Sequence, residues 1–244
     1  MKKGQIILLC SILLISLFAI NISASRDFYY RNNFESYSYG NVINYFDIFS
    51  QYPQRVNIVP RDRDKSLSIN SLSPYNNDGD IHITYNKLFT PAKNEKYIVS
   101  WEFEVESCNS SWVKIKKVTP QASSLYLYFN NIKDFLSVEF KVFANKDSCG
   151  NGKGQISAFK RTNGKTTSII PYTSYDFELN KKFKPQVVLE RINETDYIMT
   201  IYLKNREIVS SSYINIKEIK PGNILLENGG AKTYFDDFTI KRYI

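Results

Sequence analysis

The stretch KYIVSWEFEVES, residues 96–107, alternates apolar and acidic side chains from residue 101 to residue 106. Successive side chains of a β-strand point to opposite faces, so Trp101, Phe103 and Val105 share one face and the three glutamates share the other. A strand with one apolar face packs that face against a second layer and keeps its polar face outside. The stretch therefore predicts a strand of a two-layered β-protein.

The same alternation recurs along the chain, in residues 80–88, 124–130, 136–144, 185–192, 197–205 and 234–242. Clusters of turn-forming residues separate these stretches, as in residues 73–80 and 161–166, and the glycine-rich GNGKGQ at residues 150–155 is predicted to be a loop. No stretch keeps a helical period beyond one or two turns, and the 18 Tyr and 16 Phe favour strands. The sequence predicts an all-β, antiparallel two-sheet β-sandwich in a single domain, residues 25–244.

The N-terminus predicts export from the cell. MKK is a short basic segment, and residues 6–20 form an apolar run of 15 residues, shorter than a membrane-spanning helix needs. Small residues follow at Ala24 and Ser25, where a signal peptidase would cleave. We expect residues 1–24 to be a signal peptide and the mature protein to be secreted or held at the cell surface, without stable membrane insertion. An uncleaved anchor is the alternative.

Two further sequence features concern this expected compartment. Removal of Cys10 with the signal peptide leaves Cys108 and Cys149, an even pair that predicts a disulfide in an oxidising environment. Two buried free thiols are the alternative. Asn109 and Asn193 begin Asn-x-Ser/Thr motifs, so both are predicted glycosylation acceptors in a eukaryotic host.

The charge of the chain argues against a nucleic-acid partner. The formal net charge of +8 falls to +6 once Lys2 and Lys3 leave with the signal peptide. The remaining basic residues are scattered, and in RDRDK, residues 61–65, acids lie between them. A nucleic-acid site needs a continuous basic patch, which this pattern does not supply.

Several motifs resemble the concanavalin A-like jelly-roll family, of the laminin-G and glucanase type. They are NFESYSYG at residues 33–40, DIHITYNKLFTPAKNEKYIVSWEFEV at 80–105, VVLERINETDYIMTIYLKNREIV at 187–209 and NGGAKTYFDDFTIKRY at 228–243. The resemblance implies a jelly-roll β-sandwich in which the first and last strands lie side by side. It also implies a carbohydrate ligand, since many domains of this type bind or cleave glycans.

The resemblance suggests a role for the adjacent carboxylates Asp236 and Asp237 in the last strand. Only one of two successive side chains can look inward, and a buried carboxylate needs a partner. If the terminal strands pair, Glu35 would face one of the two aspartates, and calcium would relieve their repulsion. We therefore expect a structural calcium site formed by these three residues. The alternative is that one aspartate faces solvent and the other accepts bonds from the backbone, Lys or Arg.

The three glutamates of WEFEVES resemble the E-x-D-x-E strand of laminarinase-type and lichenase-type glycosidases. The resemblance would make Glu102 the nucleophile, Glu104 the orienting acid and Glu106 the general acid/base. The sequence departs from that pattern because Glu104 stands where those enzymes have aspartate. The alternative is that the glutamates form the solvated face of the strand.

Two residues are candidates for direct contact with a carbohydrate. Trp112 lies in a predicted loop, where its ring could serve as a platform for a sugar. His82, the only histidine, lies on the polar side of its predicted strand and could contact a sugar or act as the base of a polysaccharide lyase. A simple solvent-facing histidine is the alternative.

Together these observations predict a secreted carbohydrate-binding protein that binds a glycan or polysaccharide without cleaving it. The first alternative is a glycoside hydrolase or polysaccharide lyase of the same fold. The second is an extracellular adhesion or structural protein that binds another protein, such as one at the cell surface. Calcium is the only cofactor we expect.

Overall fold

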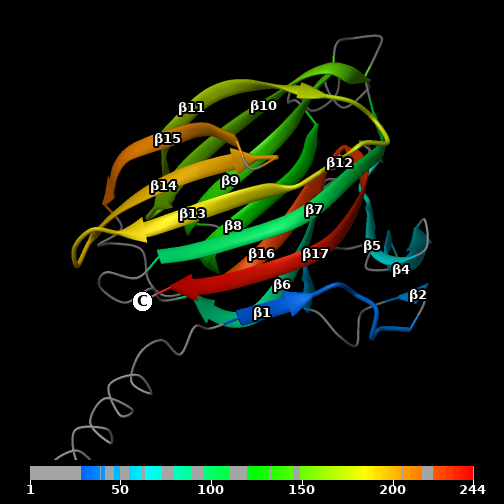
Figure 1. Cartoon of the computed structure of the whole chain (residues 1–244), viewed down its shortest axis with the longest axis horizontal. Helices are drawn as coiled ribbons and strands as arrows, with labels where there is room; N and C mark the ends of the chain where they lie inside the picture. Colours follow the sequence, from blue (N-terminus) through cyan, green and yellow to red (C-terminus); the bar gives the residue numbers. More distant parts are fainter. Residues whose placement is uncertain are drawn as a thin grey trace, which may run out of the picture.

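The computed structural model describes residues 29–38, 40–41, 47–49, 55–61, 64–72, 80–89, 96–109, 120–131, 133–144, 149–204, 206–215 and 222–243. Its elements are β-strands arranged in two sheets (Figure 1). Within these ranges no helix has the length and apolarity needed to cross a membrane. The predicted signal peptide lies outside the described residues.

The first sheet has ten strands, with β15, β14, β13, β7, β17, β5, β4 and β2 in that order across it. Two short strands extend it, because β1 pairs with β17 and β12 pairs with β7. The bounds are β1 (Tyr29–Asn32), β2 (Gly40–Asn41), β4 (Val56–Arg61), β5 (Asp64–Asn70), β7 (Lys96–Cys108), β12 (Lys182–Phe183), β13 (Pro185–Arg191), β14 (Asp196–Leu203), β15 (Arg206–Asn215) and β17 (Ala231–Tyr243).

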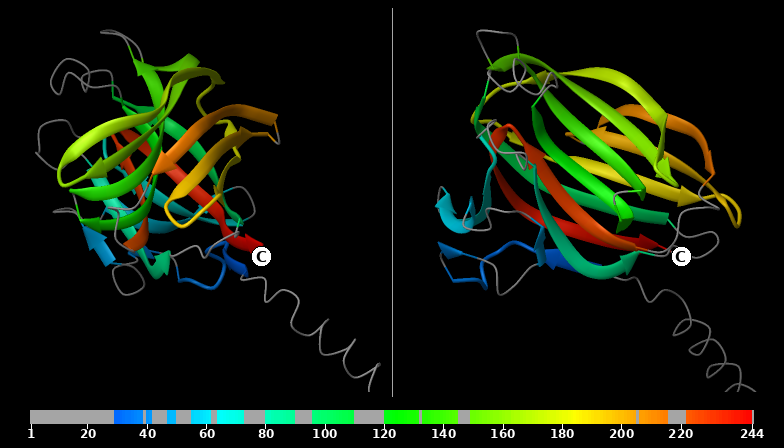
Figure 2. Two further views of the ribbon diagram at one scale, coloured as in Figure 1. Left: turned by 90° about the vertical axis from the view of Figure 1, so that its left-hand side faces the viewer. Right: turned by 180° about the vertical axis from the view of Figure 1, so that it is seen from behind.

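The second sheet has seven strands, in the order β11, β10, β9, β8, β16, β6 and β3. The two further views in Figure 2 show that it forms a second layer behind β7, β13 and β17. Its strands are β3 (Asp47–Phe49), β6 (Asp80–Phe89), β8 (Gln121–Asn131), β9 (Asp134–Ala144), β10 (Cys149–Thr162), β11 (Lys165–Phe177) and β16 (Gly222–Gly229). Neighbouring strands of both sheets pair antiparallel, so the predicted antiparallel two-sheet sandwich is confirmed.

The core lies between the sheets and is rich in aromatic rings. Trp101 and Phe103 of β7 meet Phe140 of β9, with ring centroids 5.8 and 5.5 Å apart respectively. The Trp101 indole N–H donates to Ser123 Oγ of β8 at 2.9 Å, a buried hydrogen bond between the two sheets. The apolar side of β7 therefore faces the core, as its alternation predicted.

One predicted loop is wrong. The glycine-rich residues 150–155 belong to the long strand β10. At Gly154 a Cβ atom would collide with the ring of Tyr175 on β11, so this glycine permits close packing within the sheet. The turn predicted in residues 161–166 is confirmed. Asn163 and Gly164, both with positive φ, connect β10 to β11 as a two-residue hairpin loop.

Candidate functional site

A β-bulge in β17 accounts for the two adjacent aspartates. Asp236 is the cross-strand partner of Glu102 on β7, yet the next partners are Thr239 and Ser100, so β17 contains one extra residue. Asp237 has a φ of +45°, the left-handed conformation found in bulges that interrupt strand alternation. Both aspartates consequently lie on the outer side of the sheet, which corrects the expectation that one of the two could look inward.

The bulge lies where both central strands change neighbours. β17 pairs with β5 up to Phe235 and with β1 from Phe238 onward. On the other side, β7 pairs with β12 at Phe103 and Glu104, and with β13 from Ser100. A hollow of about 290 Å³ lies at this junction, which we call the central hollow. It is lined in part by Arg31, Glu102, Lys184, Gln186, Asp237 and Thr239.

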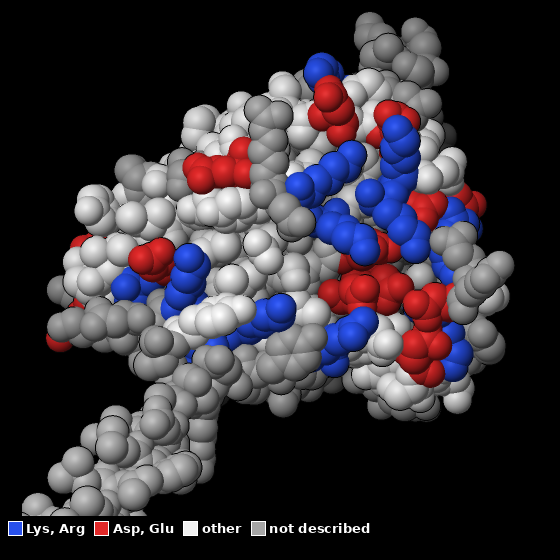
Figure 3. All heavy atoms as spheres, in the orientation of Figure 1, with Lys and Arg blue, Asp and Glu red and all other residues white. Residues whose placement is uncertain are grey.

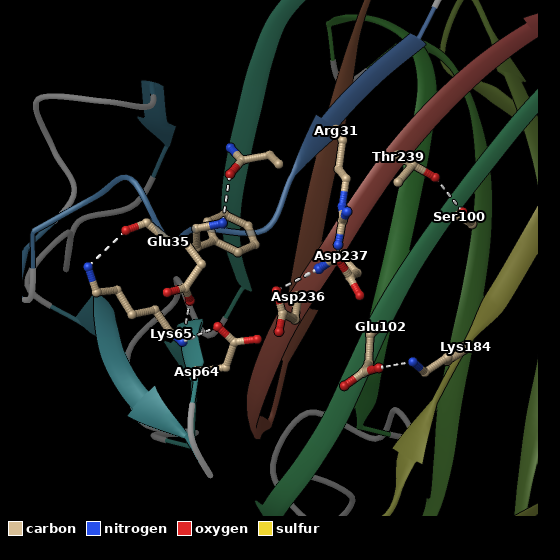
Figure 4. A network of polar contacts seen from close by, with 12 residues as sticks. Arg31, Glu35, Asp64, Lys65, Ser100, Glu102, Lys184, Asp236, Asp237 and Thr239 are labelled. Atoms are coloured by element: carbon tan, nitrogen blue, oxygen red, sulfur yellow. Dashed lines mark hydrogen bonds and ion pairs between the residues drawn. The ribbon is translucent and has the colours of Figure 1, made fainter.

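The three glutamates of β7 share the outer face, as predicted, and each is bound to a cation. Glu102 makes ion pairs with Lys182 at 3.0 Å and with Lys184 at 2.7 Å, the latter drawn in Figure 4. Glu104 pairs with Arg61 of β4. Because Glu102 and Glu104 are each only 6 % exposed, they are not the solvated strand face that we gave as the alternative.

Glu106 lies in an environment that favours its charged form. Lys232 contacts its carboxylate at 2.8 Å, and the Tyr234 hydroxyl donates a hydrogen bond to it. These two hydrogen bonds lower the pKa of Glu106. A general acid needs a raised pKa, so Glu106 lacks the property that the glycosidase resemblance requires of it.

Asp236, unlike Glu106, lies in an environment that disfavours its charged form. It is 8 % exposed, and its Oδ1 accepts the backbone N–H of Asp237 at 2.7 Å. Burial raises the pKa of Asp236 to about 6, and the neighbouring carboxylates of Asp237, Asp64 and Glu102 act in the same direction. Asp236 is therefore a carboxyl group that titrates near neutral pH at the centre of the sheet.

The terminal strands pair as predicted, but the expected calcium ligands have other partners. β1 and β17 are antiparallel neighbours, with Arg31 opposite Thr239. Glu35 accepts the backbone N–H of Lys65 at 2.6 Å, while Asp237 binds the Arg31 guanidinium at 2.6 Å (Figure 4). In the described part of the chain, no three Asp, Glu, His or Cys side chains gather as metal ligands. The structure thus does not bring Glu35, Asp236 and Asp237 together as a calcium site.

Lysine and arginine residues on this face were not recognised from the sequence. Figure 3 shows acidic and basic side chains interleaved over the part of the face formed by β5, β7, β12 and β17. Arg61 and Lys182 come from strands far from β7 in sequence, and Lys184 lies between β12 and β13, so no local pattern connects them to the glutamates. The mixture of acids and bases in residues 61–65 was the one available signal.

The two candidate sugar contacts lie largely outside what the structure describes. Trp112 is not among the described residues. His82 is placed by its backbone in β6, as the cross-strand partner of Glu227 on β16, and its side chain is not described. Both roles stay predictions.

The cysteine and asparagine predictions also stay open. Cys108 ends β7 and Cys149 begins β10, but the side chain of Cys149 lies outside the described set. Asn109 is half-buried, and its Nδ2 donates to the Leu72 carbonyl oxygen at 2.5 Å, a bond that a glycan on Nδ2 would disturb. Asn193 is exposed in the turn between β13 and β14.

Comparison with known proteins identifies the fold. No protein-family model matches the chain, and no curated protein matches it in sequence. Alginate lyase Aly36B, solved with an alginate tetrasaccharide, is similar in structure at 9 % identity and a TM-score of 0.56, over 88 % of this chain and 97 % of that one. The carbohydrate recognition domain of Emp46p in its potassium-bound form is similar at 13 % identity and a TM-score of 0.54, over 87 % and 94 %. At these identities the likeness concerns the fold, and it agrees with the predicted jelly-roll sandwich.

Proposed function

We propose that the protein binds a glycan at the central hollow, outside the cell. The observation that carries the proposal is the hollow itself, which residues of β1, β7, β13 and β17 line, on a fold shared with an alginate lyase and a carbohydrate recognition domain. The basic and apolar N-terminal sequence supports an extracellular location.

The chemistry of the hollow suits sugar hydroxyl groups, which both donate and accept hydrogen bonds. Glu102 and Asp237 supply acceptors, while Arg31, Lys184 and Gln186 supply donors. A volume of about 290 Å³ is at the lower end for small-molecule pockets, so the hollow matches one sugar unit of a longer chain. Trp101 contributes no aromatic platform, because its ring is buried against the second sheet. We expect micromolar to millimolar affinity, about −8 to −4 kcal/mol.

Binding has more support than cleavage. The glutamates proposed for a glycosidase mechanism are engaged by Lys182, Lys184, Arg61 and Lys232. Glu106 has a lowered pKa, the wrong direction for a general acid. Asp236 has a raised pKa, but it is not among the residues that line the hollow.

The test combines a glycan array with calorimetry on the hits, which should include uronate oligomers such as alginate tetrasaccharide and neutral β-glucans. In a Lys184→Ala/Gln186→Ala variant we expect the affinity at the hollow to fall about tenfold, equal to about 1.4 kcal/mol. Lys165→Ala, an exposed substitution on β11, is the matched control. If no glycan on the array binds, the result would favour a protein partner. Release of reducing sugar, abolished by Glu102→Gln, would favour the enzyme alternative.

A further inference from the structure

A second hollow lies at the edge of the sandwich, where the two sheets approach each other. β11 is the end strand of the seven-stranded sheet, β15 is the end strand of the ten-stranded sheet, and the two lie close together (Figure 1). The hollow measures about 410 Å³ and lies where β11 meets the β14–β15 turn, and we call it the edge hollow. Its volume is in the range of small-molecule pockets, about 300–1,000 Å³. None of its described lining residues lines the central hollow.

The inner wall of the edge hollow is apolar. Leu203 of β14, Ile208 of β15 and Tyr175 of β11 form it. The Tyr175 ring meets Phe183 edge to face, with centroids 5.8 Å apart, and it lies so close to its cross-strand partner Gly154 that a Cβ atom there would collide with it. The wall is therefore packed in place before a ligand arrives, which lowers the ordering cost of binding.

The rim of the edge hollow carries one positive charge in excess. Three of its described lining residues are charged, and two of them, Lys153 and Asp176, are cross-strand partners that form an ion pair. The third is Lys204, which follows β14 at the start of the turn. The hydrogen bond from Lys153 lowers the pKa of Asp176, and the charge of Lys204 acts in the same direction, so Lys204 lies near the pair. Within the described chain Lys204 has no ion pair of its own. Two lysines and one aspartate thus favour a ligand with a single negative charge.

The backbone conformation of Lys204 suggests a function for its side chain. Its φ is +54°, in the left-handed region, which costs free energy for most residues and in which asparagine is enriched. The β10–β11 loop has Asn163 in this conformation, with a φ of +51°. The turn itself therefore does not need a lysine at position 204, and strained residues of this kind cluster at ligand sites.

We propose that the edge hollow binds a small monocarboxylate, whose apolar body lies against Leu203, Ile208 and Tyr175 while Lys204 pairs with its carboxylate. The apolar body is a ring or a short alkyl chain. A sugar fits less well, because the one aromatic ring among the described lining residues, that of Tyr175, is only 5 % exposed and offers no stacking platform. The two hollows share no described lining residue, so this proposal does not depend on glycan binding at the central hollow.

The first test measures the binding of phenylacetate and octanoate to the full mature chain by calorimetry, with phenylacetamide as the uncharged counterpart of phenylacetate. We expect phenylacetate to bind about tenfold more tightly than the amide, as for a gained hydrogen bond to a charged group, and more weakly at high salt. Lys204→Asn should remove most of this difference and keep the thermal stability, since asparagine suits the left-handed conformation. Lys165→Ala, an exposed substitution at the start of β11, is the matched control and should bind as the parent does.

A second variant tests the location of the site. Ser174 is exposed on β11 and lines the edge hollow, so Ser174→Trp should fill the hollow and abolish phenylacetate binding without altering the core. The Lys184→Ala/Gln186→Ala variant of the central hollow should bind phenylacetate as the parent does, which separates the two sites.

Three results would overturn the proposal. The first is equal affinity for phenylacetate and phenylacetamide, which would give Lys204 no role in binding. The second is unchanged phenylacetate binding in the Ser174→Trp variant, which would place the site elsewhere. The third is no binding of either carboxylate at millimolar concentration.

Discussion

Asp236 of β17 and Glu102 of β7 face each other as cross-strand partners, two carboxylates at the centre of the ten-stranded sheet. Glu102 is neutralised by Lys182 and Lys184, whereas Asp236 is surrounded by further carboxylates. The bulge at Asp237 directs a third carboxylate to the same side, where Arg31 binds it. The stability of this region should therefore depend on which of the acids carry a proton.

Asp236→Asn should stabilise the protein above pH 6. The folded-state pKa of about 6 lies above the unfolded value of 3.8, so the folded state binds the proton more tightly. The contribution of this group is favourable below pH 3.8 and is lost as the pH rises through 6. Replacing the carboxyl by an amide should raise the free energy of unfolding by about 1–2 kcal/mol at pH 8 and by little at pH 4.

Urea denaturation of both proteins from pH 4 to pH 8 measures this difference. Asp176→Asn is the control, because the ion pair with Lys153 lowers the pKa of Asp176 and the substitution should not stabilise. An Asp236→Asn effect that is the same at every pH would contradict the raised pKa.

Glu104→Gln should destabilise the protein by about 2 kcal/mol at pH 7, because it leaves the Arg61 guanidinium half-buried without its counter-charge. Glu178→Gln removes an exposed ion pair with Lys181 and should change stability by less than about 0.5 kcal/mol. Chemical denaturation compares the two. Equal effects from both substitutions would mean that the Arg61–Glu104 pair is no stronger than an exposed one.

Trp101 and Ser123 should be energetically coupled across the two sheets. Trp101→Phe removes the indole N–H and leaves the Ser123 hydroxyl without its donor, so we expect a loss of about 2–4 kcal/mol. In a double-mutant cycle with Ser123→Ala, the coupling energy should be about 1 kcal/mol. Additive effects would show that the hydrogen bond contributes nothing beyond packing.

Cys108 and Cys149 are predicted to form a disulfide in the secreted protein. Closing a loop of about forty residues would stabilise the fold by roughly 4 kcal/mol in the chain-entropy model. Intact mass spectrometry after alkylation without reductant should show no modified thiol in the mature chain, and two after reduction. Two alkylated thiols before reduction would contradict the prediction.

The sequence by itself determined the strands and the two-layered fold. The alternation of Trp101, Phe103 and Val105 with three glutamates predicts which face of β7 is buried, and the structure agrees. This succeeds because strand alternation is a local property, set by the geometry of adjacent residues. It fails at Asp237, where a residue in the left-handed conformation interrupts the period, and at residues 150–155, which belong to a strand in which Gly154 permits close packing.

Only the tertiary structure decided which side chains meet. Arg61 reaches Glu104, and Lys182 and Lys184 reach Glu102, because the order and register of the strands place them side by side. Glu227, Ser124, Glu139 and Ser157 likewise lie opposite one another across β16, β8, β9 and β10. Cross-strand neighbours are set by the hydrogen-bond register between segments distant in sequence. The alternation within each strand determines only which face a residue occupies, and it does not determine which residue of the next strand lies opposite.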